Sequence, residues 1–170
     1  HATKLSPNSA SAWANFALAL DTDGQYARAE SAYRKALELD DQPTTRLNFA
    51  NNLVAQNRPS EAIAILASVI ANDDSPLAQK RLGDAYAADK DYDQAKAAYE
   101  KSIHLNPRYT GAINGQASLL IARYRAGTQL DDSLRDDAVT LWKQSIVIDP
   151  NQPQVRQLID AWGNTSLFKK

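Results

Sequence analysis

A period of 33 residues is the feature that most constrains this chain. The segment 24–37 matches the segment 90–103 at an offset of 66 residues, or two steps of 33, and a copy at 57–70 lies between them. Self-similarity at a period of 20 to 50 residues is typical of repeat arrays, in which each unit packs only on its neighbours. The sequence therefore predicts a stack of similar units.

Each unit is predicted to hold two short helices. Apolar residues recur at intervals of three and four, as at Trp13, Phe16, Ala17 and Leu20, which indicates one buried stripe on a helix. Alanine, the best helix former, makes up 29 of the 170 residues, whereas the poor helix formers glycine and proline number 6 and 7. We therefore expect an all-α fold.

Two columns of small residues run through the units, and we expect them to face each other where paired helices cross. A larger side chain in either column should overpack that crossing. The first-helix column holds Ala17, Ala50, Gly83 and Ala117, and the second-helix column holds Ala29, Ala62, Ala95 and Ala138.

With these columns the chain resembles the tetratricopeptide repeat family. Two units depart from the family pattern, because Asp41 stands in place of a closing proline and Arg46 in place of an aromatic starter. The resemblance implies an all-α, right-handed superhelix of antiparallel helix pairs, an α-α solenoid. The unit at 76–109 matches most fully, with Leu82, Gly83, Tyr86, Tyr92, Ala95, Tyr99 and Pro107.

The predicted organisation is four units and a capping helix. We expect units at 10–42, 43–75, 76–109 and 110–150, a capping helix at 151–163 that covers the last repeat, and a basic tail at 164–170. Residues 1–9 are interpreted as the end of a preceding repeat in a longer chain, or as a linker.

The fourth unit carries an insertion near 123–134. Its sequence predicts a lengthened first helix that ends at Gly127, then a loop, then aspartates at the start of the next helix, where the helix dipole favours them. Two interpretations stay open. The insertion is a tolerated surface loop, or it forms a lip of a binding groove with Tyr124 and Arg125.

Charge and composition exclude several classes of function. Lys and Arg number 19 against 20 Asp and Glu, so the field that attracts nucleic acid is missing, and we expect no nucleic-acid partner. No apolar run is long enough for a membrane span, so we expect a soluble chain without direct membrane insertion, in the cytoplasm or the periplasm. Cysteine is absent, which excludes a disulfide, a thiolate metal site and a thiol nucleophile.

The sequence predicts no catalytic residues, no metal ligands and no cofactor. His104 falls late in a second helix, where solvent exposure is expected, and His1 is terminal, so no Ser/His/Asp set can be assembled. The run Asp21-Thr22-Asp23-Gly24 begins like a calcium loop but lacks the later ligands, and it indicates an ordinary turn.

The resemblance implies a concave groove that is lined by the first helix of each unit and receives an extended peptide or a partner helix. Asn15, Asn48 and Arg81 occupy equivalent places, and asparagine amides can bond an extended backbone from both edges. The alternative is that these positions are merely solvated helix faces. The predicted groove residues are Asn15, Leu18, Asn48, Asn51, Leu77, Lys80, Arg81, Asp84, Asn114 and Ser118.

A second mode of the family, a carboxylate clamp for a peptide C-terminus, is incomplete here. Asn48 and Arg81 match it, but Ala14, Leu18 and Leu77 stand where its other side chains belong. Lys80 and Arg81 nevertheless favour an acidic segment.

We therefore predict a non-catalytic module that binds a protein or peptide partner in the groove. Two alternatives remain open. One is self-assembly into a homo-oligomer through the N-terminal end of the array, and the other is an accessory domain of a larger enzyme.

Overall fold

The computed structural model describes residues 8–127 and 131–163, and within these residues it holds nine helices and no strand, which confirms the all-α prediction. The predicted N-terminal segment, insertion and tail all include residues outside the described ranges. None of the described helices is long and apolar enough to cross a membrane. The helices are α2 (Ala10–Thr22), α3 (Tyr26–Leu39), α4 (Pro43–Ala55), α5 (Pro59–Ile70), α6 (Pro76–Ala88), α7 (Tyr92–Leu105), α8 (Thr110–Ala126), α9 (Asp132–Ile148) and α10 (Pro153–Gly163).

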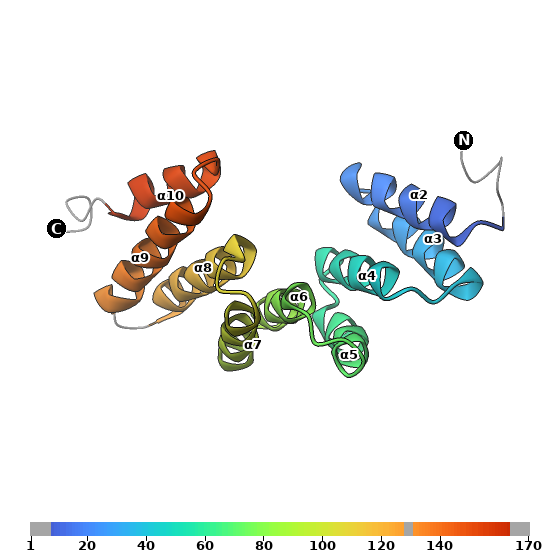
Figure 1. Ribbon diagram of the computed structural model, residues 1–170, viewed down its shortest axis with the longest axis horizontal. Coiled ribbons are helices and arrows are strands. Elements are labelled where there is room, and N and C mark those ends of the chain that lie inside the picture. The colour runs from blue at the N-terminus through green and yellow to red at the C-terminus, as the bar shows by residue number, and fades with distance from the viewer. Residues whose placement is uncertain (1–7, 128–130, 164–170) are drawn as a thin grey trace.

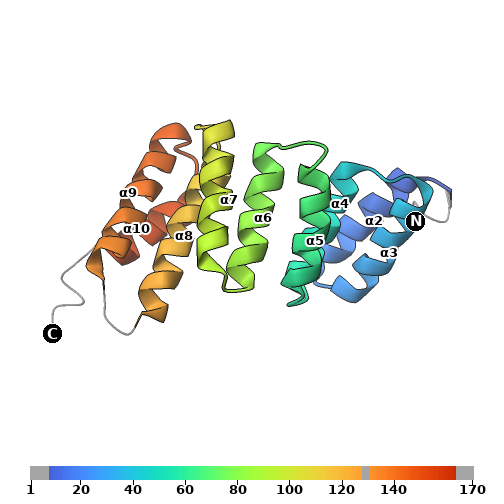
Figure 2. The same ribbon diagram turned by 90° about the horizontal axis from the view of Figure 1, so that it is seen from below.

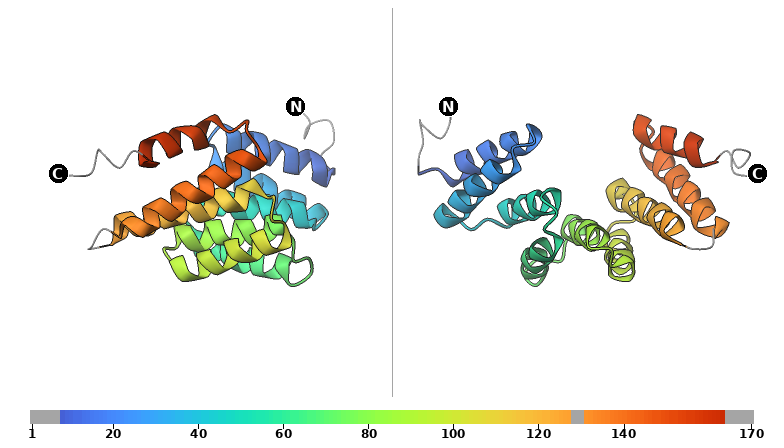
Figure 3. Two further views of the ribbon diagram at one scale, coloured as in Figure 1. Left: turned by 60° about the vertical axis from the view of Figure 1, so that its left-hand side comes forward. Right: turned by 180° about the vertical axis from the view of Figure 1, so that it is seen from behind.

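The helices form an arc with an inner and an outer side (Figure 1). Along the middle of the arc, α4, α6 and α8 line the inner side and α5 and α7 lie outside them. Seen from below, the helix pairs follow one another along the long axis (Figure 2), and the view from behind shows the same open arc (Figure 3, right). The inner side is therefore built from the first helix of each pair.

The turns inside the first three pairs share one backbone feature. Gly24, Asn57 and Lys90, at steps of 33 residues, have φ values of 71°, 59° and 64°. This left-handed conformation suits glycine and is tolerated by asparagine, but it is unusual for lysine. One turn geometry thus recurs although the residue that adopts it changes.

Helix ends follow local sequence signals. The side chains of Ser9, Ser75, Asp91 and Asp131 each accept a hydrogen bond from a backbone N–H in the first turn of α2, α6, α7 and α9. The lengthened α8 ends before its C-cap Gly127, as predicted, and Asp131 and Asp132 lie at the start of α9.

The small columns are buried as expected. Every alanine of both columns is 0% exposed, and Gly83 is buried as well. Side chains in a protein interior fill space almost as densely as molecules in a crystal, so these positions leave no room for larger groups.

The Tyr99 ring on α7 occupies the space that two glycines leave open. A Cβ added to Gly83 on α6 would lie 2.7 Å from ring atom Cδ1, and one added to Gly115 on α8 would lie 2.5 Å from Cε1. The ring is 3% exposed. Tyr99 therefore joins its own helix pair to the next one through contacts that only glycine permits.

The last described helix, in the segment predicted as a capping helix, packs on the helix pair before it. On α10, Val155 is buried, and Leu158, Ile159 and Trp162 pack on the core formed by α8 and α9. Ahead of α10, the Gln152 amide donates to the Ser145 carbonyl at 3.0 Å and to the Asp149 carbonyl at 2.8 Å. These contacts fix where the capping helix begins.

The contact between Gly83 and Tyr99 yields a stability prediction. Gly83→Ala should lower the free energy of unfolding by about 1–3 kcal/mol through overpacking, although alanine in a free helix would raise it by about 1 kcal/mol. Denaturant unfolding followed by circular dichroism measures the change.

Tyr99→Leu provides the matched background, because Leu66 fills the equivalent place in the second pair. With the ring removed, Gly83→Ala should be neutral or stabilising. If Gly83→Ala stabilises both backgrounds equally, the close packing of Tyr99 on Gly83 is refuted.

Candidate functional site

A pocket of about 240 Å³ lies between α2 and α4 at the start of both helices. We call it the α2–α4 pocket. Part of its wall comes from Asp40 and Gln42, in the connection between α3 and α4. Its lining residues are Ala10, Ser11, Ala14, Asn15, Leu18, Asp40, Gln42, Thr44, Thr45 and Asn48.

The α2–α4 pocket brings together three of the predicted groove residues, Asn15, Leu18 and Asn48. Asn15 is exposed, Asn48 is half-buried and Leu18 is 49% exposed. Neither asparagine side chain makes a hydrogen bond to another described residue. Two amides and an aliphatic side chain thus stand open to a ligand.

Asp40 is the one charged residue among those that line the pocket, and the sequence analysis missed it. It is the C-cap of α3 and is exposed, and its carboxylate accepts a hydrogen bond from Gln42 Nε2 at 2.8 Å. The predicted groove residues all lie on first helices, whereas Asp40 lies in the connection that leads into α4. The available signal was Pro43, which marks the end of this connection and the start of α4.

Farther along the inner side, Lys80 and Asp84 hold each other. Lys80 Nζ lies 2.7 Å from Asp84 Oδ2, and the Tyr99 hydroxyl donates to Asp84 Oδ1 at 2.9 Å. Burial and the neighbouring Asp84 carboxylate raise the pKa of Tyr99, so its hydroxyl remains a donor. Asp84 therefore anchors the core ring, and its carboxylate is largely satisfied within the protein.

Arg81 differs from Lys80, because its guanidinium has no ion pair with any described residue. Its Nε is buried without a hydrogen-bond partner, and the side chain as a whole is half-buried. Its charge also influences the pKa of Tyr33 in the first pair. Burial and a hydrogen bond to Asp21 raise the pKa of Tyr33, and the positive charge of Arg81 opposes that rise. Arg81 is thus a half-buried cation without an ion-pair partner among the described residues.

The other predicted groove residues differ in their exposure and in whether they form hydrogen bonds within the protein. Leu77 is 41% exposed, and Asn51 and Ser118 are exposed. Asn114 is half-buried and its amide donates to Gln152 Oε1 at 2.7 Å, so it is used to hold the capping helix.

The structure contradicts the placement of Tyr124 on a groove lip. Tyr124 is 6% exposed, and its ring packs edge-on against Trp162 of α10 with ring centroids 6.2 Å apart. The tyrosine covers apolar surface between α8 and α10. The residues around Tyr124 in the sequence give no sign of its contact with Trp162. Arg125 is exposed, but no contact joins it to the α2–α4 pocket.

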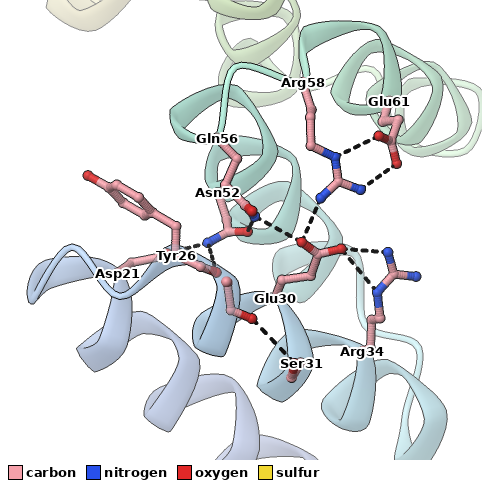
Figure 4. A network of polar contacts seen from close by, with 10 residues as sticks. Asp21, Tyr26, Glu30, Ser31, Arg34, Asn52, Gln56, Arg58 and Glu61 are labelled. Carbon is pink, nitrogen blue, oxygen red and sulfur yellow. Dashed lines mark hydrogen bonds and ion pairs between the residues drawn. The ribbon is translucent and has the colours of Figure 1, made fainter.

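An ion-pair network that the sequence analysis missed joins the first two helix pairs (Figure 4). The Glu30 carboxylate on α3 accepts from Arg34 Nη2 at 2.6 Å, Arg58 Nη1 at 2.6 Å and Gln56 Nε2 at 2.9 Å. Burial would raise the pKa of Glu30, but these hydrogen bonds outweigh it and lower the pKa to about 2. The only signal in sequence was a carboxylate one turn from Arg34.

Asn52 extends this connection into the interior. It is 0% exposed, and its amide donates to Asp21 Oδ1 at 2.6 Å and to the Tyr26 carbonyl at 3.0 Å. The Tyr33 hydroxyl donates to the other oxygen of Asp21 at 2.7 Å. The end of α4 is thereby held against the turn between α2 and α3, which fixes the position of α4 relative to α2 and hence the walls of the pocket.

No group of three or more His, Asp or Glu side chains among the described residues is arranged to hold a metal ion. His104 is exposed near the end of α7.

Larger clefts lie elsewhere, and two of them are partly apolar. One of about 450 Å³ at the first helix pair is lined by Trp13, Phe16 and Leu20, among others. Another of about 460 Å³ lies between α3, α4 and α5, where Arg46 pairs with Asp41 beside Phe49.

Comparison with known proteins identifies the repeats. Models of the tetratricopeptide repeat match residues 10–43 and 47–110. The photosystem I assembly protein Ycf3 of Rippkaea orientalis is 26% identical over 139 residues, which cover 79% of this chain and 64% of that protein. The match thus spans less than two thirds of that relative's length.

Solved structures share the fold at lower identity. PilW, a type IV pilus biogenesis factor, superposes with a TM-score of 0.76 at 20% identity, covering 96% of this chain and 74% of that chain. YrrB, a tetratricopeptide repeat protein with an unusual peptide-binding site, gives 0.64 at 16% identity, covering 91% and 76%. These likenesses confirm the predicted solenoid of helix pairs.

The ion-pair network around Glu30 yields a prediction for stability against pH. The pKa of Glu30 is about 2 in the folded chain against an ordinary 4.5, so its contribution is complete above pH 4.5 and is lost as the pH falls towards 2. Glu30→Gln should lower the free energy of unfolding at pH 7 by about 1–3 kcal/mol, as expected for hydrogen bonds to a charged group.

Urea unfolding at pH 7 and at pH 2.5 measures this loss, and the difference between wild type and variant should shrink at the lower pH. Glu38→Gln is the control. Glu38 pairs with Lys35 while 65% exposed, so its loss should change stability by less than about 0.5 kcal/mol. Equal losses at both pH values would refute the role of the ionised Glu30.

Proposed function

This chain belongs to the tetratricopeptide repeat family, whose arrays are generally non-catalytic protein-interaction scaffolds, and we propose that it binds an extended segment of a partner protein along the inner side of the arc. The segment would begin at the α2–α4 pocket and run past α6. The observation that carries this proposal is the pair of free amides in that pocket.

Asn15 and Asn48 supply the backbone recognition. A carboxamide offers two N–H donors and one carbonyl acceptor, which match the alternating carbonyl and N–H groups of an extended chain. Because neither side chain is engaged within the described protein, binding need not break an existing hydrogen bond. The helices hold both groups in place, which limits the conformational entropy lost on binding.

Side-chain selection would come from the exposed leucines and from Arg81. Leu18 and Leu77 are 49% and 41% exposed on the inner side, where a partner's apolar residues can cover them. The guanidinium of Arg81, which has no ion pair with a described residue, favours a carboxylate, since hydrogen bonds between ionised groups are stronger than those between neutral groups. An acidic residue in the bound segment is therefore part of the proposal.

Self-assembly into a homo-oligomer stays a prediction from the sequence. That the chain is an accessory domain of a larger enzyme stays a prediction from the sequence, as do the exclusion of nucleic acid and the absence of catalysis.

The groove proposal predicts that Asn15→Ala combined with Asn48→Ala weakens partner binding about tenfold or more, because two hydrogen bonds are lost. Immobilised wild type and variant are incubated with native lysate, retained proteins are identified, and the affinity of each is measured by titration.

Gln94→Ala combined with Gln144→Ala is the matched control, since it removes two exposed amides from the outer helices α7 and α9. This control should retain the same proteins as wild type. If the groove variant and the control bind equally well, or if wild type retains nothing, the inner side is not the binding site.

A further inference from the structure

The α2–α4 pocket has a negative charge at its rim that no described cation neutralises. Asp40 contacts Gln42 Nε2 through a hydrogen bond of 2.8 Å, and it forms no ion pair with a described residue. The other lining groups are neutral hydroxyls, amides and aliphatic carbons. An ionised group that enters this pocket therefore meets Asp40 as its one charged neighbour.

The lining favours a cation over an anion. The hydroxyl oxygen of Thr44 and the amide oxygens of Asn15 and Asn48 can accept hydrogen bonds from an ammonium or a guanidinium group. A carboxylate in the same place would be repelled by Asp40 and would lie beside no positive side chain. The pocket volume of about 240 Å³ suffices for the end of a long side chain.

The opposite charge lies one helix farther along the inner side. The guanidinium of Arg81 on α6 has a buried Nε without a hydrogen-bond partner and no ion pair with a described residue, whereas the neighbouring Lys80 pairs with Asp84 at 2.7 Å. Packed helices are about 8–10 Å apart, so the step from a pocket between α2 and α4 to α6 is roughly 12–15 Å. An extended chain advances about 3.3 Å per residue, which corresponds to about three to five residues.

We propose that the bound segment carries a lysine or arginine in the α2–α4 pocket beside Asp40 and an aspartate or glutamate against Arg81, about three to five residues away. This inference rests on the proposed function, because it specifies the segment that the groove receives. The two opposite charges would fix both the register and the direction of the segment.

A phage-displayed library of random twelve-residue peptides, selected on the immobilised chain and sequenced, tests the charge order. Peptides selected on wild type should be enriched about two- to fivefold in a basic and an acidic residue at the stated spacing. One order of the two residues along the peptide should prevail over the other. Asp40→Lys should lose the basic preference and keep the acidic one.

Asp149→Lys is the matched control, because Asp149 is likewise exposed, caps an outer helix and accepts a hydrogen bond from a residue two places later. It should select the same peptides as wild type. Asp40→Asn serves as a second variant if Asp40→Lys does not fold, as judged by circular dichroism, and it should reduce the basic preference.

The outcomes separate this inference from the proposed function. The charge order is overturned if wild type selects no basic residue, or if the preference for a basic residue survives both Asp40 variants. In either case, peptides whose binding requires Asn15 and Asn48 still support the groove. If wild type enriches no peptide beyond the Asn15→Ala and Asn48→Ala variant, the proposed function fails and the charge order fails with it.

Discussion

The close approach of helices at small residues is the constraint on which the rest of the structure depends. Tyr99 fits between α6 and α8 because Gly83 and Gly115 lack the Cβ atoms that would lie 2.7 and 2.5 Å from its ring. Alanines that are 0% exposed play the same part in the other pairs. These contacts set the positions of the first helices, and the first helices carry the groups of the inner side.

Polar side chains then divide into two sets, one that bonds within the described protein and one that does not. Asp21 and Asp84 accept hydrogen bonds from the core tyrosines Tyr33 and Tyr99, and Asn114 holds the capping helix. Asn15, Asn48 and Arg81 are not used in this way. Under the proposed function, this second set can form hydrogen bonds with a bound segment without disrupting the fold.

The sequence was sufficient for features that depend on periodicity or on one helix end. The helix pairs, the small columns and the end of α8 before Gly127 all follow from residues close together in the chain. Contacts between elements did not follow. Tyr124 packs on Trp162 and Arg58 reaches Glu30, and both contacts depend on how separate helices are placed in space. Asp40 was missed because the connections between units were not considered part of the groove.

The most direct test of binding on the inner side is site-specific photo-crosslinking. A photoreactive amino acid replaces Leu18 or Leu77 on the inner side, or Leu39 or Leu105 at the ends of outer helices, positions of comparable exposure. In native lysate the account predicts a protein adduct from the two inner positions and none from the two outer ones. An adduct that forms only from the outer positions would contradict it.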